Sequence, residues 1–328
     1  MNRCQLHRVH TMKAWRFALP MFPQITSDPL SVLEYLTTAW ATHSSCALVI
    51  LVEVEGPASR SPGTLLAVRD DGEYVGSLSN GCLESDVVSQ ALEAMKADQI
   101  RHIRYGAGSD YLDIQLPCGG AVTLLIIPNP SLSWLDKAIT CLQSRKSFTL
   151  DIRDILPEHE DLTEPYPRIQ YQPRLKLAIC GRGTEPVALA HMAHASGFEV
   201  EMYLPGVEEV AQLTAQGIAA QVISPGSFDG AFLDNRTAFV AMFHDHDYEI
   251  PILDKALASR AFYIGAMGSH RTHEARLSAL LNLGHSATDL DRIRGPIGLV
   301  GPMKDPHRLA ISVLAEILSE EGPQIQVA

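Results

Sequence analysis

A regular alternation of short apolar strands and helices in the second half of the chain constrains the fold most strongly. The segments LKLAIC, FEVEMYL, AFVAMF and FYIGAMG have the length and composition of buried strands. Helical segments such as PVALAHMAHASG and VEEVAQLTAQG separate them. This alternation favours a parallel sheet that helices cover on both faces. We therefore predict an α/β protein whose C-terminal domain, residues 174–322, is built on such a sheet.

The first half of the chain has a different pattern. A helix near residues 31–40 leads into the buried strand CALVILVEVEG, and Asp71-Gly72 is a turn between two further strands. The helix CLESDVVSQALEAMKA and the strand AVTLLIIP follow. These elements predict an N-terminal α+β domain over residues 28–128. Residues 129–173 combine an amphipathic stretch with a polar, proline-containing one, which we interpret as a linker region or a long hairpin.

A glycine-rich turn, Cys180-Gly-Arg-Gly-Thr-Glu-Pro186, joins the first strand and helix of the C-terminal domain. Gly181 and Gly183 allow a tight turn whose amides can approach a phosphate, as in Rossmann-like domains. Pro186 replaces the third glycine of the dinucleotide motif, and the next strand has no acidic residue at its tip to hold a ribose. NAD(P) binding is therefore disfavoured. A phosphate-containing ligand and a purely structural turn both remain compatible with this sequence.

Two later strands of this domain also end in polar segments, FHDHD and GAMGSHR. A parallel sheet binds ligands at the carboxyl ends of its strands, so we expect these segments to face the same crevice. Ser269 is expected to cap a helix, with Arg271 placed to pair with a phosphate. His244 is expected in a ligand-facing polar loop. The alternatives are a metal site or helix capping for the first segment, and a plain turn for the second.

Two of the six cysteines lie beside glycines, in SNGCLE and LPCGGA. Cys82 follows Gly81 at the predicted start of a helix, where amide dipoles favour the thiolate. Cys118 precedes Gly119, and the neighbouring glycines leave room for a large ligand. Thiolates suit molybdenum, copper or sulfur chemistry better than hard ions that prefer oxygen ligands, which makes these two cysteines candidate functional residues. The alternative is that each is a small buried apolar residue.

Charge and composition exclude several classes of protein. The net charge of −12 argues against nucleic-acid binding, which depends on clustered Lys and Arg. The cysteines form no CxxC pair, so we expect reduced thiols in a cytoplasmic protein. The N-terminal residues have no continuous apolar core, so we expect neither a signal peptide nor a membrane anchor.

Four motifs in order resemble the XdhC/CoxI family of molybdoenzyme accessory proteins, over about residues 30–320. They are GPASRSPGTLLAVRDDGEYVGSLSNGCLESDVV, LPCGGAVTLLIIP, YIGAMGSHRTHEARLSAL and PIGLVGPMKDPHRLAISVLAEIL. The family's cysteine motifs fall on Cys82 and Cys118, and its Arg-x-Pro-Gly turn begins at Arg60. Its Rossmann turn falls on Gly181 and Gly183.

The resemblance implies a chaperone rather than an enzyme. Such a protein binds molybdenum cofactor, in the molybdopterin or the cytosine dinucleotide form, while a cysteine desulfurase installs the terminal sulfur. It then helps to insert the cofactor into a xanthine-dehydrogenase-like or aldehyde-oxidoreductase apoenzyme, and a homodimer is compatible with the family. In this interpretation Cys82 and Cys118 approach the metal end, while the glycine loops hold the phosphate end.

This sequence departs from the family pattern at two places. Asn80 stands where a glycine is common, which could narrow the pocket beside Cys82. The second strand of the parallel sheet ends Leu-Pro-Gly where an Asp is common, which further disfavours NAD. Two other functions stay open: a nicotinamide-dependent oxidoreductase with His244 or His270 as acid and base, and a scaffold that binds the partner proteins alone.

Overall fold

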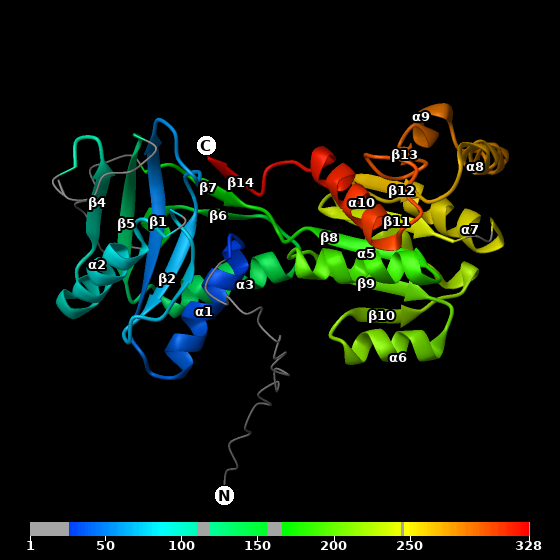
Figure 1. The fold of residues 1–328 in the computed structure, drawn as a ribbon. Helices are drawn as coiled ribbons and strands as arrows, with labels where there is room; N and C mark the ends of the chain where they lie inside the picture. The colour runs from blue at the N-terminus through cyan, green and yellow to red at the C-terminus, as the bar shows by residue number, and fades with distance from the viewer. Residues whose placement is uncertain (1–25, 80, 110–118, 156–165, 244–245, 328) are drawn as a thin grey trace, which may run out of the picture.

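The computed structural model describes residues 26–79, 81–109, 119–155, 166–243 and 246–327. Figure 1 shows two parts side by side, each built around its own sheet, with a narrower region between them. The fold class predicted from the sequence is confirmed: an antiparallel sheet with helices lies in the N-terminal part, and a parallel sheet lies in the C-terminal part.

The N-terminal sheet has five strands in the order β3-β2-β1-β5-β4, and each neighbouring pair is antiparallel. Strand β1 lies at its centre, so both of its faces are buried. Leu48 and Ile50 pack with α1 and α3 on one face, whereas Val49 and Leu51 pack with α2 on the other. The elements of this part are α1 (Pro29–Ala41), β1 (Cys46–Glu55), β2 (Leu65–Arg69), β3 (Tyr74–Gly76), α2 (Glu84–Ala97), β4 (Arg101–Gly106), β5 (Ala121–Pro128) and α3 (Leu132–Gln143).

The antiparallel order places several chain segments at one edge of this sheet. Glu55, the last residue of β1, pairs with Ala121, the first residue of β5. Gly106, the last residue of β4, pairs with the same alanine, and Gly76 at the end of β3 lies opposite Leu66 of β2. The segments that follow β1, β3 and β4 therefore all leave the sheet at this edge, which we call the cysteine edge.

The C-terminal sheet has six parallel strands in the order β10-β9-β8-β11-β12-β13. Helices α5 and α10 pack on one face of the sheet, and α7 and α8 on the other. The order reverses between β8 and β11, which is where an open parallel sheet binds its ligands. The elements are β8 (Lys176–Gly181), α5 (Thr184–Ala195), β9 (Glu199–Leu204), α6 (Val207–Ala215), β10 (Ala219–Val222), β11 (Thr237–Met242), α7 (His246–Leu257), β12 (Tyr263–Ala266), α8 (His270–Asn282), α9 (Ala287–Leu290), β13 (Ile293–Arg294) and α10 (Pro306–Glu320).

The middle region contains a third, small sheet in the order β14-β7-β6. Strands β6 (Phe148–Leu150) and β7 (Ile169–Tyr171) pair antiparallel, and a short helix, α4 (Ile152–Ile155), follows β6. Strand β14 (Ile325–Val327) runs back from α10 to pair with β7 (Figure 1). The C-terminal segment thus spans from the parallel sheet to the N-terminal part.

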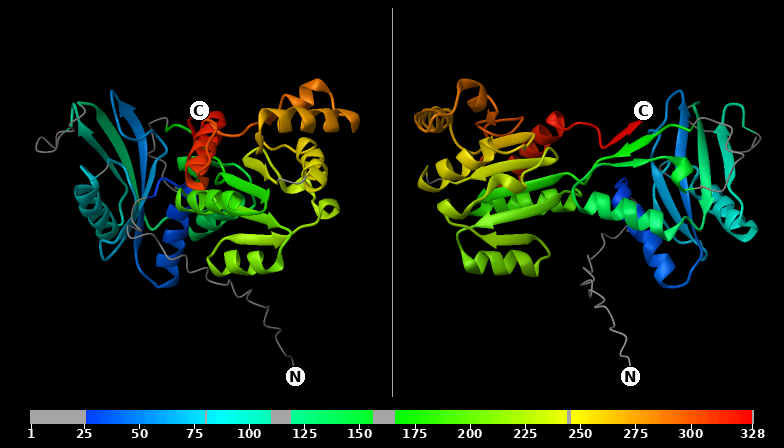
Figure 2. Two further views of the ribbon diagram at one scale, coloured as in Figure 1. Left: turned by 45° about the vertical axis from the view of Figure 1, so that its right-hand side comes forward. Right: turned by 180° about the vertical axis from the view of Figure 1, so that it is seen from behind.

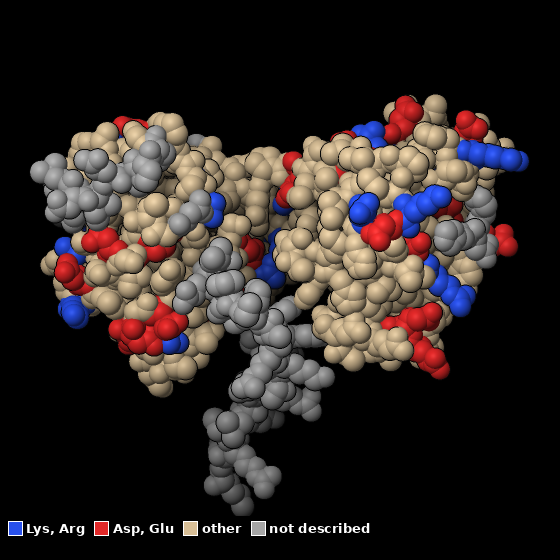
Figure 3. Space-filling model, in the orientation of Figure 1, with Lys and Arg blue, Asp and Glu red and all other residues tan. Residues whose placement is uncertain are grey.

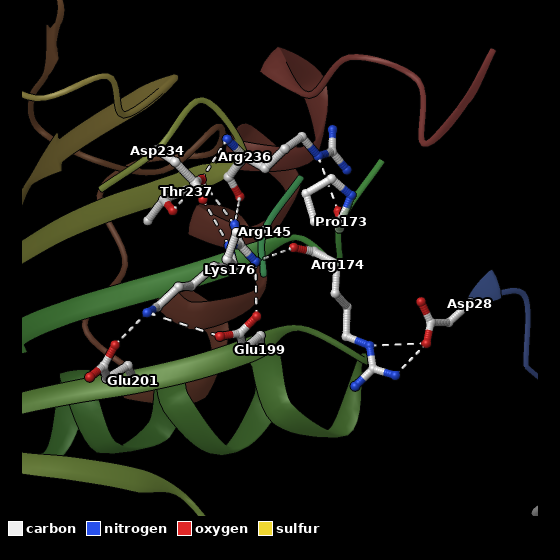
Figure 4. A network of polar contacts seen from close by, with 10 residues as sticks. All are labelled: Asp28, Arg145, Pro173, Arg174, Lys176, Glu199, Glu201, Asp234, Arg236 and Thr237. Carbon is white, nitrogen blue, oxygen red and sulfur yellow. Dashed lines mark hydrogen bonds and ion pairs between the residues drawn. The ribbon is translucent and has the colours of Figure 1, made fainter. Parts of the chain in front are cut away.

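Arg145, just after α3, joins the two parts through all five of its N–H groups (Figure 4). Its Nε and Nη2 donate to the two carboxylate oxygens of Asp234 at 2.8 and 2.9 Å. Its Nη1 donates to Glu199 Oε2 at 2.8 Å and to the carbonyl of Arg174 at 2.7 Å. Nη2 also reaches the carbonyl of Arg236 at 3.3 Å. This guanidinium fixes how the parallel sheet sits against the N-terminal part.

We predict that Arg145→Ala lowers the free energy of unfolding by about 3 kcal/mol, because it leaves the half-buried carboxylate of Asp234 without its positively charged partner. The matched control is Arg168→Ala. Arg168 is 71% exposed in its ion pair with Asp151, so its loss should cost at most about 0.5 kcal/mol. Urea denaturation measures both values. Equal effects of the two variants would contradict the role given to Arg145.

Candidate functional site

Cys82 lies exposed in the turn between β3 and α2, at the cysteine edge. The predicted helix start at Cys82 is wrong, because α2 begins at Glu84, with Leu83 as its N-cap residue. The preceding Gly81 has a φ of +98°, and no described atom lies within 4 Å of the position that a Cβ would take there. The thiol therefore stands on a turn with open space beside it.

The carboxylate of Glu84 determines the conformation of this turn. One oxygen accepts hydrogen bonds from the amides of Leu78 and Ser79 at 2.9 and 2.8 Å. The other accepts from the amide of Gly81 at 2.8 Å, the hydroxyl of Ser79 at 2.6 Å and the amide of Leu83 at 3.3 Å. Glu84 is 4% exposed. Because its oxygens bind these amides, the chain stays in a turn up to Leu83, and α2 starts after Cys82.

Burial by itself raises the pKa of Glu84, but the hydrogen bonds from the hydroxyl and amide of Ser79 and from the amide of Leu78 outweigh it. The pKa of this carboxyl group is therefore lowered from its usual value. Glu84 is ionised at neutral pH, and each of its charged hydrogen bonds is stronger than one between neutral groups.

Arg60 connects the segment after β1 to the same turn. Its Nε donates to the carbonyl of Ser77 at 3.2 Å, and its Nη2 donates to the Ser77 hydroxyl at 3.4 Å. That hydroxyl in turn lies 3.5 Å from Glu84 Oε1. Polar contacts therefore connect Arg60, through Ser77 and Glu84, to the turn that carries Cys82 at the cysteine edge.

The Arg-x-Pro-Gly turn that begins at Arg60 is held from the middle region. Gly63 has a φ of +93°, and a Cβ there would lie 2.6 Å from Ile325 Cγ2 and 2.7 Å from Ile169 Cγ2. The hydroxyl of Tyr171 donates to the Gly63 carbonyl at 2.8 Å. Only glycine fits this position, which explains why the turn ends in Gly.

Gly119 also lies at this edge, just before β5. It has a φ of +73°, and the described residues leave the position of its missing Cβ open. A Cβ on Gly120 would lie 2.4 Å from the carbonyl oxygen of Pro57, so this segment packs directly on the segment after β1. Cys118, the second predicted cysteine ligand, lies outside the described residues.

The predicted phosphate-binding residues gather at the carboxyl ends of the parallel strands. Gly181 ends β8, where a Cβ would lie 2.8 Å from the Met242 carbonyl oxygen, and Gly183 with a φ of +106° caps α5. Ser269 caps α8, as predicted, with its hydroxyl 3.1 Å from the Thr272 amide. Arg271 is exposed in the first turn of this helix. His244 lies outside the described residues.

The two groups of predicted residues do not meet within one chain. Figures 1 and 2 show α2, which begins at the cysteine edge, at one end of the molecule, and α7 and α8 at the other. The structure therefore brings Arg60, Gly81, Cys82 and Gly119 together at the cysteine edge. The glycine turns of the parallel sheet form a separate edge.

Two structural residues were missed by the sequence reasoning. One is Glu84, whose carboxylate binds the turn before α2. Arg276 is fully buried between α8 and α7, where its Nη2 donates to Glu249 Oε1 at 2.8 Å and to the Met267 carbonyl at 2.6 Å. The signal for Arg276 was its place four residues before Leu280, on the apolar face of a helix.

Within the described ranges, no group of three or more His, Cys, Asp or Glu side chains could hold a metal ion.

The fold and its two edges define a two-domain protein with an exposed thiol on an antiparallel sheet and glycine turns on a Rossmann-like sheet. Residues 39–106 match the XdhC and CoxI family, and residues 177–317 match the XdhC Rossmann domain. An Escherichia coli (strain K12) protein named molybdenum cofactor insertion chaperone PaoD is 34% identical, over 90% of this chain and 89% of the relative. The chain belongs to the XdhC/CoxI family, which confirms the resemblance carried by its motifs.

Two further comparisons agree with this assignment. A Bacillus subtilis (strain 168) protein, named as a probable subunit of xanthine dehydrogenase, is 26% identical, over 84% of this chain and 93% of the relative. A crystal structure from Bacillus halodurans, described as a xanthine dehydrogenase, has the same fold. Its TM-score is 0.71 at 23% identity, over 88% of this chain and 95% of that chain. The name of the Escherichia coli relative is that of an accessory factor, which is what the motifs predict for this chain.

We predict that Glu84→Ala releases the turn that carries Cys82. Hydrogen exchange of the Ser79 and Gly81 amides should become about tenfold faster or more, because each loses a hydrogen bond to a charged acceptor. The control is Glu93→Ala on the same helix, where the side chain is 62% exposed and pairs with Arg101. Unchanged exchange in Glu84→Ala would contradict the proposed role of the carboxylate.

The lowered pKa of Glu84 also predicts a pH dependence. The stabilisation from Glu84 is complete above its unfolded pKa, about 4.3, and is lost as pH falls through its lower folded pKa. Glu84→Gln should therefore cost about 2 kcal/mol at neutral pH, and this cost should shrink below about pH 4. Urea denaturation across this range measures it. A cost that grows on acidification would be inconsistent with an ionised Glu84.

Proposed function

We propose that this protein is a molybdenum-cofactor-binding chaperone, with the cysteine edge as the place where the metal end of the cofactor binds. One observation carries this proposal: an exposed thiol, Cys82, stands on a turn that the buried carboxylate of Glu84 holds in one conformation. Thiolates bind molybdenum and sulfur groups well. The name of the Escherichia coli relative, an insertion chaperone for this cofactor, supports the same function.

The residues at the cysteine edge fit such a ligand. The thiol is exposed, and the positions beside Gly81 and Gly119 are open among the described residues, which suits a bulky dithiolene group. Molybdenum, when bound, would supply a soft metal centre for thiolate ligands. The protein's own contribution is to hold Cys82 outward and to place the positive charge of Arg60 nearby. Cys118 remains a proposed second ligand.

The separation of the two edges changes the expected binding mode. Gly181 ends β8, Gly183 caps α5, and Ser269 and Arg271 lie at the start of α8, which is at the other end of the molecule from α2 (Figures 1 and 2). His244, which lies outside the described residues, remains a proposed member of this group. We therefore propose that these turns bind a phosphate group separately from the cofactor's metal end. A homodimer is the assembly in which the turns of one copy could approach the cysteine edge of another, and a cytosine dinucleotide cofactor would need such an arrangement.

Nicotinamide-dependent oxidoreduction is the weaker alternative. Glu201, the acid nearest the end of β9, lies three residues before the strand ends at Leu204. Its carboxylate already binds Lys176 Nζ and Gln221 Nε2, each at 2.5 Å, so it is not placed to hold a ribose. Titration with NADH and NADPH, followed by nicotinamide fluorescence, tests this alternative, and we expect no saturable binding.

The proposed partners are a cysteine desulfurase, which sulfurates the bound cofactor, and a xanthine-dehydrogenase-like or aldehyde-oxidoreductase apoenzyme, which receives it in the cytoplasm.

On the face in Figure 3, Lys and Arg side chains are interspersed with Asp and Glu rather than gathered into one basic area. This face suits protein partners better than nucleic acid. Among the residues that the structure describes, no helix is long and apolar enough to span a membrane.

The direct test mixes the purified chain with isolated molybdenum cofactor and separates the mixture by gel filtration. Molybdenum and pterin should elute with the protein. If neither does, while the chain still binds the desulfurase or the apoenzyme, the protein is a scaffold and the proposal is wrong.

We predict that Cys82→Ala lowers the molybdenum retained in this experiment about tenfold or more, since even residues that only support a metal site commonly contribute that much. Cys141→Ala is the matched control, because Cys141 lies partly buried on α3, away from the cysteine edge. Metal analysis and pterin fluorescence of the eluted protein measure both variants. If Cys82→Ala and Cys141→Ala retain equal amounts of molybdenum, Cys82 is not part of the cofactor site.

A further inference from the structure

A pocket of about 290 Å³ lies between the Arg-x-Pro-Gly turn and the C-terminal segment that leads into β14. Its first wall is the turn at residues 59–64, and its second wall is the segment at residues 323–325. The residues that line it are Ser27, Ser59, Arg60, Ser61, Thr64, Pro323, Gln324 and Ile325. No site described above includes this pocket, although Arg60 belongs to both the pocket and the cysteine edge.

The lining of the pocket has the chemistry of an oxyanion site. Arg60 is the only charged residue among the eight, and four others carry a hydroxyl group. The chain has 38 acidic residues against 26 Lys and Arg, yet the eight lining residues include no acid. Guanidinium and hydroxyl groups are the usual side-chain donors to phosphate oxygens. Thr64 already donates its hydroxyl to the Ser61 carbonyl at 2.8 Å, and Arg60 Nη1 donates to the Ser59 carbonyl at 3.2 Å. A dianionic group here would therefore meet the serine hydroxyls of the lining beside the positive charge of Arg60, without facing a carboxylate of the lining.

Both walls of the pocket are held in place by buried contacts. Ile325 pairs with Tyr171 across β14 and β7, and the Tyr171 hydroxyl donates to the Gly63 carbonyl at 2.8 Å. Arg236 holds the chain just before the second wall. It is 6% exposed and donates to Glu321 Oε1 at 2.7 Å and to the Gly322 carbonyl at 3.2 Å. The pocket is therefore preformed rather than assembled from loose segments, which lowers the entropic cost of binding.

Arg60 belongs both to this pocket and to the group of contacts that holds Cys82. Arg60 is one of the lining residues, and its guanidinium donates to the carbonyl and hydroxyl of Ser77 and to the carbonyl of Ser59. The Ser77 hydroxyl contacts Glu84, which binds the turn that carries Cys82. A ligand in the pocket would therefore lie against the same edge of the sheet as the thiol.

We infer that this pocket binds the phosphate monoester end of the ligand whose metal end lies at Cys82. The inference rests on the proposed function and gives it a phosphate site within one chain, which the distant glycine turns at Gly181 and Gly183 do not provide. The C-terminal segment forms one wall of this open site, so the last strand of the chain has a binding role besides its structural one.

The probe is inorganic phosphate, which is titrated into the full-length chain. Chloride at equal ionic strength is the control, and the unfolding temperature is measured at each concentration. Ligands that bind the folded state raise the unfolding temperature, and the stabilisation grows with the logarithm of the ligand concentration once that concentration exceeds Kd. We expect the unfolding temperature to follow this dependence from millimolar phosphate upward, with no such rise in chloride. Arg60→Gln should weaken the apparent affinity about tenfold, the usual loss for a hydrogen bond from a charged donor.

Ser61→Asp tests the pocket without removing Arg60 from the Cys82 turn. The added carboxylate repels phosphate, whereas the matched Ser61→Asn variant has the same shape without the charge and should bind normally. Arg271→Gln removes a donor from the separate phosphate site proposed at the α8 end, so the phosphate stabilisation that remains in this variant reports the pocket. The inference is wrong if phosphate does not stabilise the Arg271→Gln chain, or if Ser61→Asp binds phosphate like Ser61→Asn in that background.

Measuring how much cofactor the wild-type chain, Cys82→Ala and Ser61→Asp retain distinguishes a failure of this inference from a failure of the proposed function. If Cys82→Ala loses the molybdenum cofactor while Ser61→Asp keeps it, the chaperone function stands and the pocket is not its phosphate site. If phosphate binds the pocket but the wild-type chain retains no cofactor, the pocket is an oxyanion site and the proposed function is wrong. Loss of cofactor from both variants supports the two together.

Discussion

The account of this protein depends on one buried carboxylate. Glu84 binds the amides of the turn before α2, and so it decides where the helix begins and how Cys82 is presented. A buried charge is costly unless it is fully hydrogen-bonded, and here the amides and the Ser79 hydroxyl meet that requirement. The same carboxylate connects through Ser77 to Arg60, so the polar contacts of the cysteine edge form one unit.

The antiparallel topology explains why distant residues meet at this edge, and the parallel sheet explains why the glycine turns meet at another. How the two sheets sit against each other depends on different residues. Arg145 binds Asp234 and Glu199 across the boundary, and the C-terminal strand β14 returns to pair with β7. Together these contacts keep the two edges apart, so each needs its own functional explanation.

The sequence predicts the parallel-sheet domain well, because its strands are apolar runs and its helices carry recognisable caps such as Ser269. It also predicts the residues of the two edges, since glycine-flanked cysteines and glycine turns are local patterns. It does not predict β6, β7 and β14, because three-residue strands show no periodicity and β14 pairs with a partner more than 150 residues away. The role of Arg145 depends on contacts between distant segments, which no local pattern encodes. Glu84 binds residues just before it in the chain, but its position near a helix start does not reveal that its side chain turns back onto their amides.

The central claim is that the Cys82 thiol lies against the bound cofactor. The most direct measurement is the alkylation rate of Cys82 with and without molybdenum cofactor, read by mass spectrometry, with Cys141 in the same chain as the internal reference. The account predicts that the cofactor slows alkylation of Cys82 and leaves that of Cys141 unchanged. Equal rates at Cys82 with and without bound cofactor would contradict it.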